Sequence, residues 1–247
     1  MNLQLKHDQR PLYVQAVDIL QALIAETPYH PGEQLPPECA LARDLGISRT
    51  TLRMALGHLE LQGIIRRRQG VGTFVTTSPA GRIAGGLQFL SSVQCLARTA
   101  GLVTETTQRE VAQVAATEAW AEALDVPPET PLHQVRCAVA IDGLPVAYLL
   151  SLIPADRVEG EALARAEGSL LDYLTARGEP YLAYTHSRIY AVDADAALAS
   201  TLRVAEASAL IHLREVYFDD NDAPVALSFN YFVSERFNFY IRRQVVG

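Results

Sequence analysis

The sequence predicts an α+β protein in two parts: a small helical domain closed by a β-hairpin, and a larger domain built on a mainly antiparallel sheet. Three observations support this class. Apolar residues repeat with a helical period through most of residues 12–61. Two short strands separated by glycines follow over residues 64–75. Beyond residue 89, apolar strand-like runs alternate with helical segments, and the chain of 247 residues is long enough for two modest domains.

The N-terminal domain, residues 1–77, is predicted to contain three helices and a hairpin. The first helix ends before Pro28, and the second begins at Pro36, where proline suits the first helical turn, and ends at Gly46. Ser48 is placed to cap the third helix. The apolar stripe of this third helix is formed by Leu52, Ala55, Leu56 and Leu59.

Residues 78–88 are interpreted as a linker, because Thr77-Ser78-Pro79-Ala80-Gly81 is a cluster of turn-forming residues. Residues 89–247 form the second predicted domain. Its expected strands are 107–114, 132–141, 144–152, 185–192, 209–219 and 223–233. Its expected helices are 90–100, 116–124, 159–177 and 193–203.

An internal repeat divides the second domain. Leu124-Asp125-Val126 corresponds to Leu202-Arg203-Val204, and Pro145-Val146-Ala147 corresponds to Pro224-Val225-Ala226. Each copy has the order helix, strand, tight turn, strand. We therefore expect two related halves that form one sheet.

Charge is unevenly distributed along the chain. The formal net charge is −7, which ordinarily argues against a nucleic-acid partner. Residues 1–77 nevertheless hold 8 basic against 7 acidic residues, and the basic ones concentrate between Arg43 and Arg68. The remaining chain carries the acidic excess. A locally basic N-terminal domain beside an acidic second domain indicates that the two have different partners.

Other features exclude several classes of protein. Cys39, Cys95 and Cys137 lie far apart without a CxxC motif, which is typical of reduced cytosolic thiols. The first residues contain no apolar leader segment, and no apolar run approaches the roughly 18 residues of a membrane span. We expect a cytoplasmic protein with no membrane partner.

The third helix and the hairpin form a candidate DNA-binding surface. Arg49 and Arg53 lie on the helix face opposite the leucine stripe. A short turn between two helices, with polar and basic residues beginning the second, is typical of a helix-turn-helix, whose recognition helix enters the major groove. The hairpin would be a wing that approaches the DNA backbone. The candidate DNA contacts are Arg43, Ser48, Arg49, Thr50, Thr51, Arg53, Arg68, Gln69 and Gly70.

These motifs resemble the winged helix of the GntR family of bacterial transcription regulators. The similarity lies in 31–38 (PGEQLPPE), 45–53 (LGISRTTLR) and 70–75 (GVGTFV). The resemblance implies DNA contacts at the start of the third helix and at the wing tip. Cys39 occupies a position where the family usually carries a DNA-contacting arginine, so a weaker or altered operator preference would follow, which Arg43 could offset. Cys39 is either a redox sensor or, the favoured alternative, a buried or inert thiol.

The rest of the chain resembles the effector-binding domain of the HutC branch of this family, called UTRA, which has a chorismate-lyase-like fold. The similarity lies in Arg136 within a strand, Asp142-Gly143 with Pro145, Gly168-Ser169-Leu170, and Glu235-Arg236-Phe237. In that branch a strand arginine and a serine at a helix N-terminus hold a phosphate or carboxylate. The resemblance assigns these roles to Arg136 and Ser169, although a surface salt bridge and a simple helix cap are the alternatives. The candidate effector contacts are Ser91, Arg136, Tyr148, Ser169, Tyr173, Tyr184, His186, Ser228 and Asn230.

Together these features predict a sequence-specific repressor that is released from its operator by a small anionic metabolite, a phosphate, phosphonate or carboxylate. A homodimer on a pseudo-palindromic operator is expected. No catalytic residue, metal site or cofactor is predicted, because no nucleophile-base motif or Cys/His cluster occurs. The alternatives are an enzyme with lyase-like activity and a non-specific architectural DNA binder.

Overall fold

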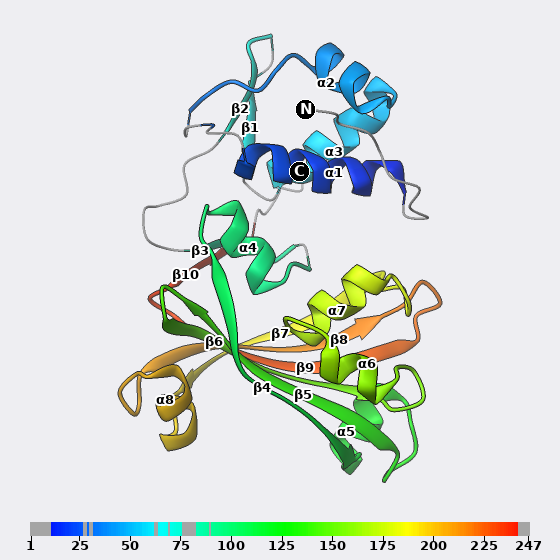
Figure 1. The fold of residues 1–247 in the computed structure, drawn as a ribbon, viewed down its shortest axis with the longest axis vertical. Helices are drawn as coiled ribbons and strands as arrows, with labels where there is room; N and C mark the ends of the chain where they lie inside the picture. The colour runs from blue at the N-terminus through cyan, green and yellow to red at the C-terminus, as the bar shows by residue number, and fades with distance from the viewer. Residues whose placement is uncertain are drawn as a thin grey trace, which may run out of the picture. The chain divides into compact units, whose positions relative to one another are not determined.

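A computed structural model describes residues 11–26, 29, 32–61, 64–68, 70–75, 83–88 and 90–241. The chain divides into two compact units (Figure 1). The first contains residues 1–89, 96–101 and 238–247, and the second contains residues 90–95 and 102–237. The predicted seam at 77–81 lies outside the described residues. None of the helices within the described ranges combines the length and apolar character needed to cross a membrane.

The N-terminal part of the first unit has the predicted order of three helices and a hairpin. Its elements are α1 (Leu12–Glu26), α2 (Glu38–Leu45), α3 (Arg49–Leu61), β1 (Ile65–Arg68) and β2 (Gly72–Val75). Gly46 ends α2 in the left-handed conformation with φ 68°, as the glycine in the sequence predicts. The helix-turn-helix of α2 and α3 is therefore confirmed.

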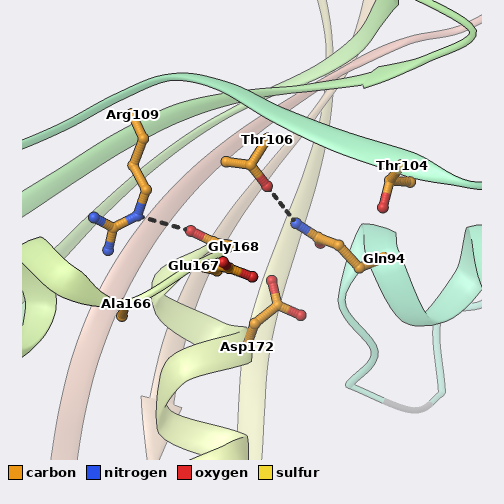
Figure 2. A pocket seen from close by; sticks show the side chains of 8 residues that line it. All are labelled: Gln94, Thr104, Thr106, Arg109, Ala166, Glu167, Gly168 and Asp172. Carbon is orange, nitrogen blue, oxygen red and sulfur yellow. Dashed lines mark hydrogen bonds between the residues drawn. The ribbon is translucent and has the colours of Figure 1, made fainter.

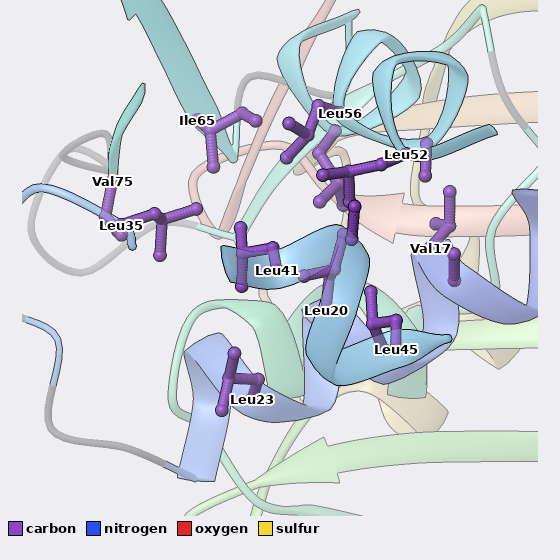
Figure 3. Close-up of a cluster of buried hydrophobic side chains, with 14 residues drawn as sticks. Val17, Leu20, Leu23, Leu35, Leu41, Leu45, Leu52, Leu56, Ile65 and Val75 are labelled. Carbon is purple, nitrogen blue, oxygen red and sulfur yellow. The ribbon is translucent and has the colours of Figure 1, made fainter. Parts of the chain in front are cut away.

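One apolar core holds these helices and the hairpin together. Leu52, Ala55, Leu56 and Leu59 of α3 are fully buried, as predicted from their spacing. They pack against side chains of α1, α2, β1 and β2, so the orientation of α3 is set by contacts on three sides (Figure 3). The other main members of this cluster are Val17, Leu20, Leu23, Leu35, Leu41, Leu45, Ile65 and Val75.

The wing is a small antiparallel sheet. β1 pairs with β2 from Ile65 opposite Val75 to Arg68 opposite Gly72. Residues 32–35 add a third segment, because the amides of Gly32 and Leu35 donate to carbonyl oxygens of β2. The motif preceding α2 therefore supports the wing directly, which the sequence did not reveal.

The second unit is built on one six-stranded antiparallel sheet with the order β4-β5-β6-β9-β8-β7. Its strands are β4 (Thr104–Ala115), β5 (Pro131–Ile141), β6 (Leu144–Pro154), β7 (Tyr184–Asp193), β8 (Ala209–Phe218) and β9 (Pro224–Val233). The order is symmetric about the β6–β9 pair, so β4-β5-β6 and β7-β8-β9 are the two predicted halves. Asp125 and Arg203, equivalent in the repeat, both end a helix with φ near 50°.

Helices cover both faces of this sheet. On one face, Val135 and Ile153 pack against apolar residues of α6 (Gly160–Arg165) and α7 (Leu170–Arg177). On the other face, Leu132 and Leu152 pack against α5 (Glu118–Leu124), and Leu210 packs against α8 (Ala196–Leu202). Because side chains alternate along a strand, each sheet residue belongs to either the α6/α7 face or the α5/α8 face.

The secondary structure differs from the prediction in three places. The single helix expected over 159–177 is two helices, because Gly168 has φ 76° and Ser169 begins α7 as a capping residue. Two short strands were missed: β3 (Ile83–Gly86) pairs with β10 (Phe237–Tyr240), so part of the predicted linker is a strand. The expected helix at 90–100 is the shorter α4 (Val93–Thr99).

Candidate functional site

The N-terminal end of α3 presents polar and basic side chains to solvent. The Ser48 hydroxyl accepts a hydrogen bond from the Thr51 amide at 3.0 Å and lies 2.8 Å from the Thr51 hydroxyl, so Ser48 caps the helix as predicted. Arg49 and Thr50 are exposed. Arg49 forms no hydrogen bond or ion pair with another residue that the structure describes, and its guanidinium is free to bind an external acceptor.

Glu38 links α3 to the wing. Its carboxylate accepts from Arg53 Nε at 2.9 Å and from Arg67 Nη2 at 3.2 Å. The hydrogen bond from Arg53 is the main reason that the pKa of Glu38 is lowered. The pairing uses Nε of Arg53, so the terminal nitrogens of this predicted DNA contact are left for another acceptor. Glu38 thus fixes a basic side chain of α3 relative to the strand β1.

The tip of the wing carries two glycines with positive φ. Gly70 is exposed with φ 74° and open space around it, and Arg68 stacks over the Phe74 ring at 5.3 Å. At Gly72, φ is 144° and an added Cβ would collide with the Gln34 side chain. The positive φ at position 72 therefore favours glycine, and another residue there would also displace the Gln34 side chain, while Gly70 adds no side chain to the tip. Gln69, also predicted to contact DNA, lies outside the described residues.

Arg43 and Cys39 lie on α2. Arg43 is exposed and pairs with the neighbouring Asp44 at 3.3 Å, so it remains available as a peripheral contact. Cys39 is exposed, so it is not the buried thiol that was one form of the favoured alternative, while an inert thiol stays a prediction. Cys39 is exposed because Leu41, Ala42 and Leu45 form the inner face of this short helix, which leaves the position of Cys39 toward solvent.

We expect Glu38→Gln to reduce the acid sensitivity of the first unit. Because the folded-state pKa of Glu38 is lowered, its ion pairs stabilise the protein above the ordinary glutamate pKa of about 4.3, and this contribution is lost as the pH falls through the lowered value. The partly exposed pair contributes less than about 1 kcal/mol. Thermal unfolding of both proteins between about pH 7 and pH 3 measures the difference; an identical pH dependence would contradict this role.

The structure separates the predicted effector residues between the two faces of the sheet. Arg136 lies on the α5/α8 face, where its Nη2 donates to Glu110 at 2.8 Å and its strand neighbour on β6 is Leu150, which packs with α5. Its side chain is 41% exposed. Ser169 begins α7, on the opposite face. Arg136 and Ser169 therefore lie on opposite faces of the sheet, and Arg136 forms the salt bridge given as its alternative, while its role toward an effector stays a prediction.

Three predicted aromatic contacts share the face of Arg136. Tyr148 packs with the α8 cluster. Burial raises the pKa of its hydroxyl, and the nearby charge of Arg136 partly lowers it again. His186 is paired in register with Val216, which packs with α5. Tyr184 stacks on Phe218 with ring centroids 5.0 Å apart. Tyr184 and His186 are nevertheless exposed, and the Tyr184 hydroxyl donates to Asp222 at 2.7 Å, whereas Tyr148 is half-buried.

The remaining candidates lie on the α6/α7 side or before α4. Tyr173 packs in the α7 core and its hydroxyl accepts from Arg177. Ser228 and Asn230 are buried in a polar network in which the Ser228 and Ser151 hydroxyls are 2.7 Å apart, and Asn230 Nδ2 donates to Glu215 at 2.8 Å. Ser91 is half-buried, one residue before Ser92, whose hydroxyl accepts from the Cys95 amide near the start of α4.

Glu215 anchors the buried network. Ser187 Oγ donates to its second oxygen at 2.6 Å, and only 7% of the residue is exposed. Burial raises its pKa, and the hydrogen bonds from Ser187 and Asn230 partly counter that shift. Burial likewise raises the pKa of the fully buried Tyr217, which adjoins it. The sheet therefore carries a fixed acidic group beneath α6 and α7.

A cavity of about 540 Å³ opens on the α6/α7 side (Figure 2). None of the nine predicted effector residues lines it, although Ser169 lies between two residues that do. Its walls come from α4, from β4 and from the α6–α7 loop and α7. The lining residues are Gln94, Thr104, Thr106, Arg109, Ala166, Glu167, Gly168 and Asp172.

Arg109 is the pocket arginine that sequence reasoning missed. Its Nε donates to the Gly168 carbonyl at 3.0 Å and its Nη2 donates to the Leu163 carbonyl at 2.6 Å, so it ties β4 to the α6–α7 loop. The preceding Gln108 has φ 51°, and the pairing of β4 with β5 shifts between Thr107 and Glu110. This bulge turns Arg109 toward α7. The alternation of polar and apolar residues in the sequence did not predict the bulge.

Cys137, next to Arg136, belongs to the pocket side of the sheet. Burial raises the pKa of its thiol to about 12, while the charge of Arg109 lowers this pKa and the charge of Asp172 raises it. The thiol is 1% exposed.

Family comparisons agree with this division of the chain. Residues 12–75 match the family described as bacterial regulatory proteins, gntR family, and residues 99–238 match the UTRA domain. An HTH-type transcriptional regulator of Rhizobium meliloti (strain 1021) is 30% identical over 228 residues, which is 91% of this chain and 92% of that protein. The probable fructoselysine utilization operon transcriptional repressor of Escherichia coli (strain K12) is 26% identical over 90% of both chains.

Solved structures share the fold. PhnF from Mycobacterium smegmatis covers 94% of this chain and 100% of its own, with a TM-score of 0.61 and 23% identity. The possible transcriptional regulator YydK from Bacillus subtilis covers 94% of this chain and 100% of its own, with a TM-score of 0.67 and 17% identity. Both likenesses bear on architecture alone.

Proposed function

Because the chain belongs to the GntR family of bacterial transcription regulators and carries a UTRA domain, we propose that it is a repressor released from its operator by a small polar metabolite. Its class as a DNA-binding regulator follows from the family, whose members compared above are regulators rather than enzymes. The repressor direction is supported by relatives named as repressors.

The observation that carries the proposal is the exposed end of α3 beside the wing. Ser48, Arg49, Thr50 and Arg53 begin a helix whose opposite face is fully buried, so the rigid core holds their positions. Arginine can bond two acceptors of guanine in the major groove, and hydroxyls near a helix start can hold phosphates. Arg68 and the slim tip at Gly70 suit contact with the DNA backbone.

A homodimer on a pseudo-palindromic operator is part of the proposal. Two copies related by a two-fold axis would place two recognition helices about one DNA turn, roughly 34 Å, apart or at a multiple of that distance. Chemical crosslinking and sedimentation would show whether two chains act together, and footprinting would show the spacing of the half-sites.

The test of regulation starts from DNA selected out of genomic fragments by the purified protein. We expect a footprint on a defined DNA sequence. A thermal-shift screen of phosphates, phosphonates and carboxylates should then identify a compound that abolishes this footprint. A footprint without sequence preference would favour an architectural DNA binder instead. Conversion of the compound by the protein would favour the enzyme alternative.

We further propose that the effector binds the cavity bounded by Arg109, rather than at Arg136. That the effector carries an acidic group stays a prediction. Among the eight lining residues, Arg109 is the only cation that could bind such a group. For an effector that carries an acidic group, Arg109→Gln should weaken binding about tenfold or more, the effect of losing one charge-assisted hydrogen bond. Operator binding without effector should remain.

Arg136→Gln is the matched control, because it removes the same charge from the other face of the sheet. Calorimetric titration of both variants with the compound that releases the operator compares how much each face of the sheet contributes to effector affinity. If Arg136→Gln abolishes the response and Arg109→Gln leaves it intact, the effector binds on the α5/α8 face and the cavity is not its site. A melting temperature close to that of the parent shows that the α6–α7 loop survives the loss of Arg109.

A further inference from the structure

The start of α7 is already occupied by a carboxylate of the chain itself. The Ser169 amide donates to Asp172 Oδ2 at 2.9 Å, and the Ser169 hydroxyl donates to the same oxygen at 2.6 Å. The Asp172 amide in turn donates to the Ser169 hydroxyl at 3.2 Å, which completes a capping box. The amide and hydroxyl of Ser169 and the amide of Asp172 are therefore already paired within the chain, and Ser169 is only 3% exposed.

The one guanidinium of the lining is also engaged. Two of the three nitrogens of Arg109 donate to the carbonyl oxygens of Gly168 and Leu163. In Figure 2 its terminal nitrogens point away from Asp172. An incoming anion would have to compete with these backbone bonds or use the nitrogen that remains.

Hydrogen-bond acceptors face the cavity in excess. Against the single cation stand the carboxylates of Glu167 and Asp172, so the lining has a formal charge of −1. Their side chains and the amide of Gln94 converge on the middle of the cavity in Figure 2. Gln94 Oε1 is buried and has no hydrogen-bond partner among the described residues, and the amide nitrogen donates to Thr106 at 3.4 Å.

Another carboxyl group lies on the α6/α7 face of the sheet. Glu215 is paired in register with Ser228 and is 7% exposed. The cavity is open to solvent on the side of the exposed Glu167. A ligand that supplies donors and positive charge would satisfy these acceptors, whereas a ligand that is only an anion would meet two carboxylates.

We propose that the effector carries an ammonium group and that Asp172 and Glu167 bind it. This inference rests on the proposed function, since it assigns a chemical class to the ligand of the same cavity. It makes the effector an amine or a zwitterion. Arg109 could bind an acidic group elsewhere in the ligand, but the lining of the cavity chiefly selects the ammonium group.

A series of equal chain length tests the proposal on the full-length protein. Putrescine, 4-aminobutyrate and succinate share four carbons and carry two, one and no ammonium groups. At about ten times the dissociation constant, an amine should raise the melting temperature by roughly 3 °C. Concentrations up to about 10 mM would detect binding near 1 mM. At least one of the two amines should stabilise the protein and succinate should not. A shift with succinate as large as that with the amines, or no shift with either amine, overturns the proposal.

Isosteric variants link the shift to the cavity. Asp172→Asn keeps an oxygen for the capping box and Glu167→Gln keeps the size of the side chain, yet each removes a charge. Each should weaken amine binding about tenfold, while Glu161→Gln, an exposed carboxylate on α6 that does not line the cavity, should leave it unchanged. Equal binding in all three variants would place the amine elsewhere and overturn the assignment.

The outcomes separate this inference from the proposed function. If an anion releases the operator and the amines do not bind, the ligand class is wrong and the regulator stands. If no defined DNA sequence is footprinted, the proposed function fails whatever binds in the cavity.

Discussion

Arg49→Ala is expected to lower operator affinity about 5-fold to 150-fold, corresponding to about 1–3 kcal/mol for a lost bidentate contact to a base. Arg49 begins α3, is exposed, and has no hydrogen-bond or ion-pair partner among the described residues, so its loss costs the fold little. Fluorescence anisotropy with the footprinted operator measures the change, and the same titration with a scrambled sequence shows whether Arg49 reads bases or only phosphates.

Arg165→Ala is the control for charge alone. Arg165 lies on α6 in an exposed pair with Glu161, distant in sequence and role from the winged helix. The Arg165→Ala substitution removes one positive charge, as Arg49→Ala does, and should leave operator affinity unchanged. If Arg49→Ala binds the operator as tightly as the parent does, Arg49 does not contact the DNA. The base contact would then be assigned to Arg53 or to the wing.

Leu56→Ala is expected to destabilise the winged helix by about 2–5 kcal/mol. Leu56 is fully buried in the centre of the core that joins α3 to α1, α2 and the hairpin, so truncation leaves a cavity that several elements line. A domain of this size has a stability of only about 5 kcal/mol. Operator binding should therefore fall sharply at physiological temperature and recover in part on cooling.

Met54→Ala provides the matched control on the same helix. Met54 is 50% exposed, and shortening it removes a side chain of similar size without opening the core. Urea unfolding followed by circular dichroism should show a midpoint near that of the parent for Met54→Ala and a clearly lower one for Leu56→Ala. Similar midpoints for the two variants would contradict the packing described for α3.

Local sequence signals predicted most of the DNA-contacting unit. Gly46, the Ser48 cap and the leucine spacing of α3 each act within a few residues, so helix ends and the inner face could be read directly. The same reasoning failed where a local signal was overlooked. The Gly168-Ser169 pair is both a glycine stop and a cap, and it divides the helix expected over 159–177.

The lining of the cavity on the α6/α7 side was not predicted from the sequence. Arg136 was assigned by the resemblance to the UTRA domain, and its position in β5 places its side chain on the α5/α8 face, because neighbouring strand residues point to opposite faces of a sheet. The bulge at Gln108 brings Arg109 to the α7 side instead. The lining joins positions 94, 104–109 and 166–172, which only the packing of α4, β4 and α7 on one sheet brings together.

The sequence by itself determined that this chain is a two-part, winged-helix regulator with an antiparallel second domain, and it identified the basic end of α3. It could do so because caps, turns and periodicity act over a few residues, and because the DNA surface is nearly continuous in the chain. Only the tertiary structure decided which polar residues line the cavity between α4, β4 and α7, where the effector is proposed to bind. That choice depends on strand order, register and one bulge, which are set by contacts between residues far apart in the sequence.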